Sequence, residues 1–227
     1  MDKNKETVLE KRVERTLDAL RRNQMEAFYV AKREGVVPLV EGLLKEGDRV
    51  AVGGSMTLTE TGVIEHLRCG RYDFLDRTAP GLTAEEVRQI QLQSFGVDAY
   101  LASVNAITEA GELYLVDGNG NRAAAVLFGP TSVILVAGVN KIVGNLDGAV
   151  RRVKEWAAPA NCLRLSCDTY CREKGQCVSL ADGKGASAPF MTAGCGQGRI
   201  CCDYVVLARQ RLPGRIKVIL VGEELGY

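Results

Sequence analysis

The chain has 227 residues, of which 46% are hydrophobic and 25% charged, and its formal net charge is +1 at pH 7. A chain of this size and composition can bury a sizeable core, and its near-neutral charge does not indicate nucleic-acid binding, which usually requires a basic face. Its apolar runs are far shorter than the roughly 18–20 residues of a membrane span, and its charged first segment lacks the apolar stretch of a signal peptide, so we expect a cytoplasmic protein.

Hydrophobic periodicity divides the chain into alternating helices and strands. In the first half it predicts helices over residues 6–22, 36–44, 57–67 and 83–94, and strands over 25–31, 49–52, 72–75 and 97–103. In the second half it predicts strands over 113–116, 132–137, 203–209 and 216–221, and helices near 122–128 and 146–156. The central strands are short and apolar, which is typical of strands buried on both faces. The alternation predicts a Rossmann-like α/β fold, with a mainly parallel sheet between helices.

One segment differs from the rest in composition. Residues 158–202 are rich in Cys, Gly and Ser, and seven of the eight cysteines lie between Cys162 and Cys202. We therefore expect one α/β domain over residues 1–227, with a loop-rich, metal-binding lobe over 158–202 within it. Disulfides are rare in a reducing cytosol, so clustered thiols favour metal or redox chemistry. The alternative is that most of them are small buried side chains or adventitious disulfides.

Four stretches of the sequence resemble the lactate-utilisation (LUD) domain family. They are GGSMTLTETG from Gly53, NAIT from Asn105, VDGNGNR from Val116 and GVNKIV from Gly138. The resemblance extends over nearly the whole chain. It implies a fold of the kind found in ribose-5-phosphate isomerase, glucosamine-6-phosphate isomerase and the CoA transferases. It also implies an association with lactate oxidation and iron–sulfur redox proteins.

A glycine-rich turn, Gly53-Gly54-Ser55-Met56-Thr57, joins a predicted strand to a predicted helix. Glycines let a backbone approach a ligand closely, and the N–H groups at a helix start attract anions. From the residues alone, a tight turn in which Thr57 caps the helix explains the sequence equally well. The resemblance favours a loop that binds phosphate or carboxylate through Gly53, Gly54, Ser55 and Thr57.

Polar residues also follow the other strands, and open α/β sheets bind ligands at their strand ends. The residues expected to line the same crevice and to hold an anionic small molecule are Asn105, Asn121, Arg122, Asn140 and Lys141. In the folds that the resemblance implies, a carboxylate in this crevice acts as base or nucleophile, so Glu109 and Asp117 are the candidate catalytic residues. The alternatives are an Asx turn at Asp117 and a solvated helix start at Arg122.

The resemblance also implies a set of metal ligands, because the family commonly has four cysteines in this region. The matching residues are Cys171, Cys177, Cys195 and Cys201. This sequence departs from the family in its longer Val178–Gly194 segment and in having no proline before Cys171. Four thiolates can hold a [4Fe–4S] cluster or a tetrahedral zinc ion, and the spacings here are loose for zinc. The alternative ligands are Cys162, Cys167 and Cys202.

Three functions remain open at this point. The first is a protein of lactate or organic-acid utilisation that binds an iron–sulfur cluster and works in an assembly with redox proteins. The second is an enzyme that acts on a phosphorylated sugar or an acyl-CoA, with the glycine-rich turn binding the ligand and an acidic residue acting as acid or base. The third is a structural zinc module. The charged N-terminal helix is either a solvated face or an oligomer interface.

Overall fold

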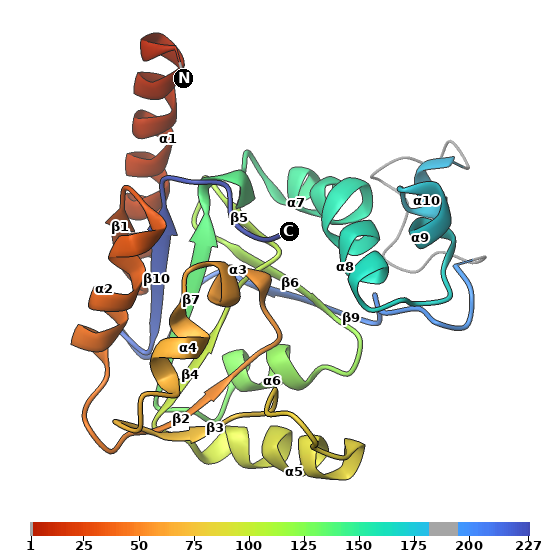
Figure 1. Ribbon diagram of the computed structural model, residues 1–227. Helices are drawn as coiled ribbons and strands as arrows, with labels where there is room; N and C mark the ends of the chain where they lie inside the picture. Colours follow the sequence, from red (N-terminus) through yellow and green to blue (C-terminus); the bar gives the residue numbers. More distant parts are fainter. Residues whose placement is uncertain (1, 182–194) are drawn as a thin grey trace.

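The centre of the fold is a parallel β-sheet (Figure 1). The computed structural model describes residues 2–181 and 195–227. Within these residues the sheet runs in the order β1 (Glu26–Val30), β10 (Ile216–Val221), β7 (Ser132–Gly138), β4 (Ala99–Ala102), β2 (Arg49–Val52) and β3 (Asp73–Leu75), and each neighbouring pair is parallel. The predicted mainly parallel sheet is therefore confirmed, with β7, β4 and β2 side by side.

The middle strands β4 and β7 are buried on both faces. In β4, Tyr100 packs into the core on one side of the sheet and Leu101 into the core on the other. In β7, Leu135 and Ile134 divide between the two cores in the same way. Because neither face reaches water, these strands are apolar along their whole length, which explains their unbroken hydrophobic runs in the sequence.

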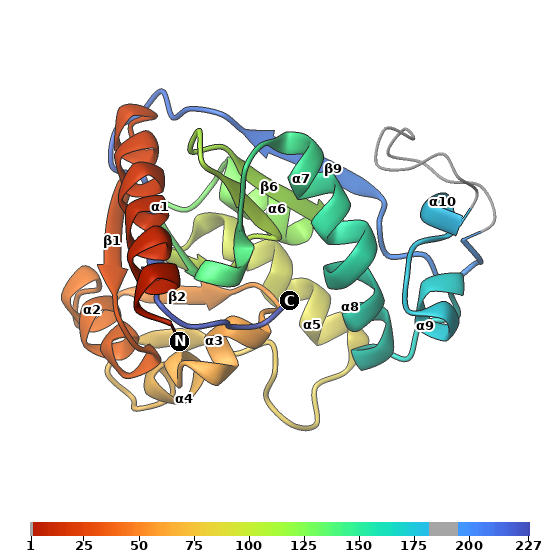
Figure 2. The ribbon, with the colours of Figure 1, turned by 90° about the horizontal axis from the view of Figure 1, so that it is seen from above.

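Helices cover both faces of this sheet (Figure 2). The core on one face includes residues of α2 (Val36–Leu43), α3 (Met56–Glu60) and α4 (Val63–Leu67). The core on the other includes residues of α1 (Lys3–Arg22) and α6 (Asn121–Leu127). The remaining helix before β4 is α5 (Ala84–Gln93). It begins at the predicted place, and Thr83 and Glu86 form a capping box at its start.

One expectation about local structure was wrong, and one predicted strand belongs to a second sheet. The single helix expected over residues 57–67 is broken into α3 and α4, because Gly62 adopts a left-handed conformation with φ of 73° between them. The apolar run 113–116 forms β6 (Leu113–Asp117), which does not join the parallel sheet. It belongs to a second sheet of order β8-β5-β6-β9, in which β6 pairs antiparallel with both neighbours.

The second sheet includes two strands that the sequence did not predict. They are β5 (Ala106–Thr108) and β8 (Ile142–Val143), which are too short to show a periodic pattern. Its remaining strand is β9 (Asp203–Leu207). One face of the small sheet contributes Ile107 and Leu115 to a core shared with the main sheet, and the other packs Tyr114 and Val116 against the helices that follow β8.

Those helices form a continuous wall. α7 (Leu146–Arg152) leads into a π-helical turn, Val153–Ala157, and then into α8 (Ala158–Arg164). The start of the expected loop-rich lobe is therefore helical, and two short helices follow, α9 (Tyr170–Lys174) and α10 (Val178–Ala181). Most of the long Val178–Gly194 segment lies outside the described residues. Among the helices that the structure describes, none is long and apolar enough to span a membrane.

Candidate functional site

A polar cleft of about 260 Å³ lies beside the carboxyl ends of three neighbouring parallel strands. Gly54 and Ser55 follow β2, Ser103 follows β4, and Lys141 follows β7, and all four residues line the cleft. The opposite side of the cleft is formed by α6, the end of β6 and the helical wall. This is the position at which open α/β sheets bind ligands, because the loops after parallel strands meet at one edge.

Lys141 lies at the base of this cleft and is only 2% exposed. Its ammonium group donates hydrogen bonds to Thr57 Oγ1 at 3.0 Å and to Ser103 Oγ at 2.9 Å. Burial, together with the positive charges of Arg152 and Arg122, lowers the pKa of Lys141 to about 7. Within the described residues Lys141 forms no ion pair, so hydroxyl groups alone hold this buried amine.

Arg122 is fixed in the cleft by its hydrogen bonds to the second sheet. Its Nε donates to Asp117 Oδ1 at 2.8 Å, and its Nη2 donates to Asn105 Oδ1 at 2.8 Å. Nη1 donates to the carbonyl oxygen of Ser103 at 2.9 Å. The other carboxylate oxygen of Asp117 accepts the backbone N–H of Ala123 at 2.7 Å, at the start of α6. Asp117 therefore positions Arg122 and the first turn of α6, and its catalytic role stays a prediction.

The glycine-rich turn has two different glycines. A Cβ on Gly53 would lie 3.0 Å from Tyr100 Oη and 3.1 Å from Arg122 Cγ, so this position requires close approach of the backbone to protein side chains. Gly54 has nothing within 4 Å of the same point and lines the cleft. Ser55 caps α3 by accepting the N–H of Leu58 at 3.2 Å. The capping residue is therefore Ser55, not Thr57 as the simpler interpretation of the turn supposed.

The structure brings together most of the residues predicted for the crevice. Those that line the cleft are Gly54, Ser55, Asn105, Asp117, Asn121, Arg122 and Lys141. Gly53 and Thr57 do not line the cleft, but Gly53 packs against Arg122 and Thr57 accepts a hydrogen bond from Lys141. The side chain of Asn140 donates hydrogen bonds to the carbonyl oxygens of Leu225 and Gly226 and does not line the cleft. Glu109 lies elsewhere: its carboxylate forms ion pairs of 2.8 Å with Arg12 and Arg15 of α1.

Several residues of the cleft were missed by the sequence analysis. The ones that carry polar or charged groups are Arg77, Ser103, Asn119, Asn161, Arg164, Arg199 and Tyr227. Ser103 follows β4 directly, so its place at a strand end was a usable signal. Arg77 and Asn119 lie on the loops after β3 and β6, whereas Asn161 and Arg164 lie on α8 and Arg199 in the segment before β9.

A second, smaller pocket contains the four cysteines that match the family pattern. Cys171, Cys177, Cys195 and Cys201 all line it, and we call it the thiol pocket. Its remaining walls come from the helical wall, from Tyr114 of β6 and from Tyr204 of β9. The backbone ties the segments together, because the N–H of Tyr170 donates to the carbonyl oxygen of Cys195 at 3.1 Å. The four thiols therefore line one pocket, and their binding of a metal stays a prediction.

The thiols of this pocket influence one another. Burial raises the pKa of Cys201 to about 12, and the neighbouring thiols of Cys171, Cys177 and Cys195 add to the effect. The Sγ atom of Cys171 lies 3.5 Å from that of Cys162, and this hydrogen bond lowers the pKa of Cys171. Thiolates gathered this closely repel each other unless a cation lies between them.

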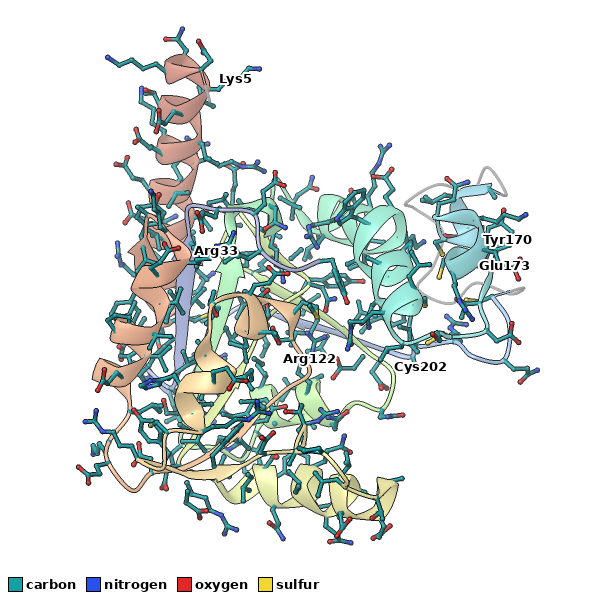
Figure 3. The ribbon with its side chains drawn as sticks, viewed as in Figure 1. Lys5, Arg33, Arg122, Tyr170, Glu173 and Cys202 are labelled. Atoms are coloured by element: carbon teal, nitrogen blue, oxygen red, sulfur yellow. The ribbon has the colours of Figure 1, made fainter. Side chains whose placement is uncertain are left out.

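The spare cysteines do not line the thiol pocket. Cys162 touches it only through its contact with Cys171, and Cys202 is exposed (Figure 3). Cys167 is partly exposed, and Cys69 is exposed on a distant part of the chain. Within residues 2–181 and 195–227, no three His, Cys, Asp or Glu side chains are arranged around a single point that would hold a metal ion.

The cleft and the thiol pocket share one partition. Val153 and Ala158 of the helical wall, together with Arg199 and Cys201, line both of them. The π-helical turn belongs to this partition, and the carbonyl oxygen of Lys154 within it accepts the N–H of Cys177 at 2.9 Å. π-Helical turns are often found at functional sites because they shift side chains relative to a regular helix. The cleft therefore borders the thiol pocket directly at Cys201.

The family model of the LUD domain matches residues 13–221 of this chain. The crystal structure of a DUF162 family protein from Deinococcus radiodurans is similar to it, with a TM-score of 0.50 and 15% sequence identity over 94% of this chain and 98% of that one. At this identity the likeness concerns the fold alone. eIF2B beta from Chaetomium thermophilum reaches a TM-score of 0.34 at 16% identity, over 50% of this chain and 43% of that one, which is too low to bear on fold or function. No curated protein matches the sequence.

Proposed function

Because the chain belongs to the LUD domain family, whose members are related to lactate utilisation, we propose that it is an iron–sulfur protein of organic-acid oxidation. In this proposal, Cys171, Cys177, Cys195 and Cys201 bind a [4Fe–4S] cluster. When bound, such a cluster accepts and passes on single electrons. The partners are then redox proteins that supply or receive these electrons within an assembly.

The observation that carries the proposal is the meeting of the four cysteines in one pocket. Cys171 lies on α9, Cys177 follows it, Cys195 begins the last described segment, and Cys201 precedes β9. The other three cysteines between residues 162 and 202 lie outside this lining. If the cysteines were only small apolar side chains, there would be no reason for these four to share a pocket while the other three lie outside it, because any of the seven could fill such a place equally well.

The surroundings of the four thiols also suit a buried inorganic group. Tyr114 lines the same pocket, is 1% exposed, and its hydroxyl has no hydrogen-bond partner among the described residues. A buried hydroxyl group without a hydrogen-bond acceptor costs free energy, and the sulfur atoms of a cluster can accept such a hydrogen bond. Val150 and Val153 line the same pocket and add apolar surface to it. Low polarity around a cluster is one of the features by which proteins tune its potential.

A single zinc ion suits this arrangement less well. Four sulfurs bound to one zinc ion lie about 2.3 Å from it, so they must meet around a single point. The described thiols surround a pocket without such a point. A four-iron cluster offers a separate iron to each thiolate and therefore accepts ligands that stand further apart. This difference favours the cluster over the structural zinc module.

The proposal is tested by purifying the protein without oxygen and measuring iron, acid-labile sulfide and zinc. We expect iron and sulfide in comparable amounts, and an absorption band near ~400 nm that bleaches on reduction. The variants C171S, C177S, C195S and C201S should each lose most of the iron. The matched controls are C202S, which changes the neighbour of Cys201, and C69S, which changes an exposed cysteine far from the pocket. Both should keep it.

Three results would overturn the proposal. Stoichiometric zinc without sulfide would establish the zinc module instead. Protein without any metal after anaerobic purification would remove the cluster from the function. Full retention of iron in all four variants would mean that other residues bind it. Circular dichroism of each variant shows whether the sheet is intact, so that loss of metal is separated from loss of fold.

A further inference from the structure

Basic side chains outnumber acidic ones in the lining of the cleft. Among the described residues that line it, five are basic and one is acidic. The basic ones are Arg77, Arg122, Lys141, Arg164 and Arg199, and the acidic one is Asp117. Asp117 is already bound to Arg122. A concave site lined by one sign of charge concentrates ligands of the opposite sign.

Lys141 is the group whose surroundings are most unusual. Its amine is buried, and its two hydrogen-bond acceptors, Thr57 and Ser103, are uncharged hydroxyl groups. Lysine side chains are rarely buried to this extent without a carboxylate partner, because a hydroxyl does not neutralise an ammonium charge. The amine nevertheless borders an open cleft, so a partner can reach it from solvent.

The charges that face Lys141 act against its protonation. Arg152 of α7 and Arg122 of α6 both lower the pKa of Lys141 by their positive charge, and Glu60 of α3 has a smaller opposing influence. Arg152 is held there by hydrogen bonds to the carbonyl oxygens of Asn140 and Asn105, at 2.9 and 2.7 Å. Burial and these neighbours bring the pKa of Lys141 to about 7. An anion placed beside the amine would reverse the effect and cause the amine to take up a proton.

The size and the remaining lining of the cleft restrict the anion further. A volume of about 260 Å³ is at or below the lower end of the usual range for ligand pockets, so the ligand is small. The other polar groups near the base are amides and hydroxyls, which bind the oxygen atoms of hydroxyl or carbonyl groups. They include Ser55, Asn119, Asn121 and Asn161. A compact acid with additional oxygen atoms fits these groups.

We propose that the cleft binds a small organic anion, whose carboxylate or phosphate group pairs with Lys141 and supplies the negative charge that the described part of the chain does not place there. Arg164 at the rim attracts the anion, and Arg122, held rigid by Asp117, forms the adjoining wall. The amine of Lys141 contacts no cysteine, although Arg199 and Cys201 line both the cleft and the thiol pocket. Because this proposal depends on Lys141, it is tested separately from the iron–sulfur proposal.

The test is isothermal titration calorimetry of the purified full-length protein with four probes: pyruvate, lactate, inorganic phosphate and ribose 5-phosphate. At pH 6.5 we expect saturable millimolar or tighter binding of at least one of them. Binding by the first two alone identifies a carboxylate ligand, and binding by the last two alone a phosphate ligand.

The variant K141M should weaken the binding of the probe by about 10–100-fold, the range expected for losing a charge-assisted hydrogen bond in a buried site. R164Q should weaken it by no more than about fivefold. The control K45M, at an exposed lysine outside the cleft, should bind like the wild type.

The pH dependence gives a readout that a merely structural lysine would not change. The affinity of the wild type should be constant below pH 7 and fall by about tenfold for each pH unit above it, because binding then requires uptake of a proton. Titrations at pH 8 in two buffers with different ionisation heats measure this uptake directly. For K141M neither effect should be seen.

Three results would overturn the proposal: absence of saturable binding by all four probes, unchanged affinity in K141M, or a wild-type affinity that does not change from pH 6.5 to 9. All titrations are repeated with C171S, which changes a residue of the thiol pocket that does not line the cleft, so that loss of a cluster does not affect the conclusion.

Discussion

Asp117 and Arg122 form a buried ion pair in which one carboxylate oxygen accepts twice. Oδ1 lies 2.8 Å from Nε and 2.6 Å from Nη2 of the guanidinium, and the two side chains are 8% and 13% exposed. Because Oδ2 also accepts the N–H of Ala123, this carboxylate joins the second sheet to α6 as well as to the cleft. The residue that the sequence suggested as a catalytic acid thus has a clear positioning role.

The first prediction concerns this pair. Asp117→Asn keeps the shape of the side chain but removes the charge that faces a buried guanidinium, so it should lower the free energy of unfolding by about 3 kcal/mol. Urea denaturation followed by circular dichroism measures the loss. Asp203→Asn, at the exposed residue paired with Asp117 across the two strands, should change stability by less than about 0.5 kcal/mol. Equal stability of the two variants would contradict the role given to Asp117.

The second prediction concerns the ion pairs between Glu109 and α1. The hydrogen bond from Arg15, together with Arg12, lowers the pKa of Glu109. The stabilisation is therefore complete above the pKa of the unfolded state, about 4.3, and is lost as the pH falls through the lower folded value. Glu109→Gln should cost about 0.5–1 kcal/mol at pH 7, after allowance for solvent exposure. The difference from wild type should shrink below pH 4.

A control for this prediction is Glu14→Gln, which changes an exposed residue of α1 that forms no ion pair within the described residues. It should show no such pH dependence. Because Glu109 lies outside the cleft, its substitution should also leave the affinity for the anionic probes unchanged. A large fall in that affinity would restore Glu109 as a candidate for the site.

The third prediction separates the two glycines of the turn after β2. Gly53→Ala places a methyl group 3.0 Å from Tyr100 Oη and 3.1 Å from Arg122 Cγ, so both side chains must shift. We expect a loss of about 1–2 kcal/mol in unfolding free energy and weaker probe binding, since Arg122 lines the cleft. Gly54→Ala meets nothing within 4 Å and should be neutral or slightly stabilising. The same measurements on both variants decide this, and equal behaviour of the two would contradict it.

The fourth prediction concerns stability and Lys141. Its pKa is about 7 in the folded protein, whereas an unfolded lysine has one of about 10.4. Between these values the unfolded state binds the extra proton, so wild-type stability should rise with pH across this window. Relative to K141M, the rise between pH 7 and 10 should be on the order of 3 kcal/mol. The exposed-site control K45M should show no such difference from wild type, and parallel curves for wild type and K141M would contradict the burial effect.

The fifth prediction joins the two proposed sites. Arg199 and Cys201 line both the cleft and the thiol pocket, so an anion in the cleft changes the electrostatic surroundings of Cys201, which we proposed as a cluster ligand. Addition of a binding probe to anaerobic protein should shift the electron paramagnetic resonance spectrum of the reduced cluster. The shift should be absent in K141M at the same probe concentration. Identical spectra with and without a bound probe would show that the partition isolates the two sites.

Much of the fold was determined by local pattern. The strands β2, β4 and β7 are apolar because both of their faces are buried, and that property is readable in the sequence without any knowledge of their partners. The capping of α5 by Thr83 was likewise readable, because it depends on residues three positions apart. The thiol pocket was partly readable, since the four cysteines that match the family pattern are the ones that line it.

Other features depended on contacts between distant segments. Leu113–Val116 has the same apolar character as β7, yet it pairs antiparallel with β5 and β9 in a separate sheet, and strand pairing is not encoded by the hydrophobicity of one strand. Glu109 and Asp117 are both acids near strand ends in the sequence. Only the tertiary structure directs the first towards α1 and the second towards Arg122 in the cleft.

The sequence by itself therefore determined the class of the fold and the apolar strands of the main sheet, because both follow from residue type and short spacing. The resemblance to the family singled out the four cysteines that line the thiol pocket. The tertiary structure decided the surroundings of Lys141. Thr57 and Ser103, which bind its amine, are 84 and 38 residues away in the chain, and Arg152 approaches from the helical wall. Burial, charge and pKa are sums over neighbours in space, so no local pattern in the sequence specifies them.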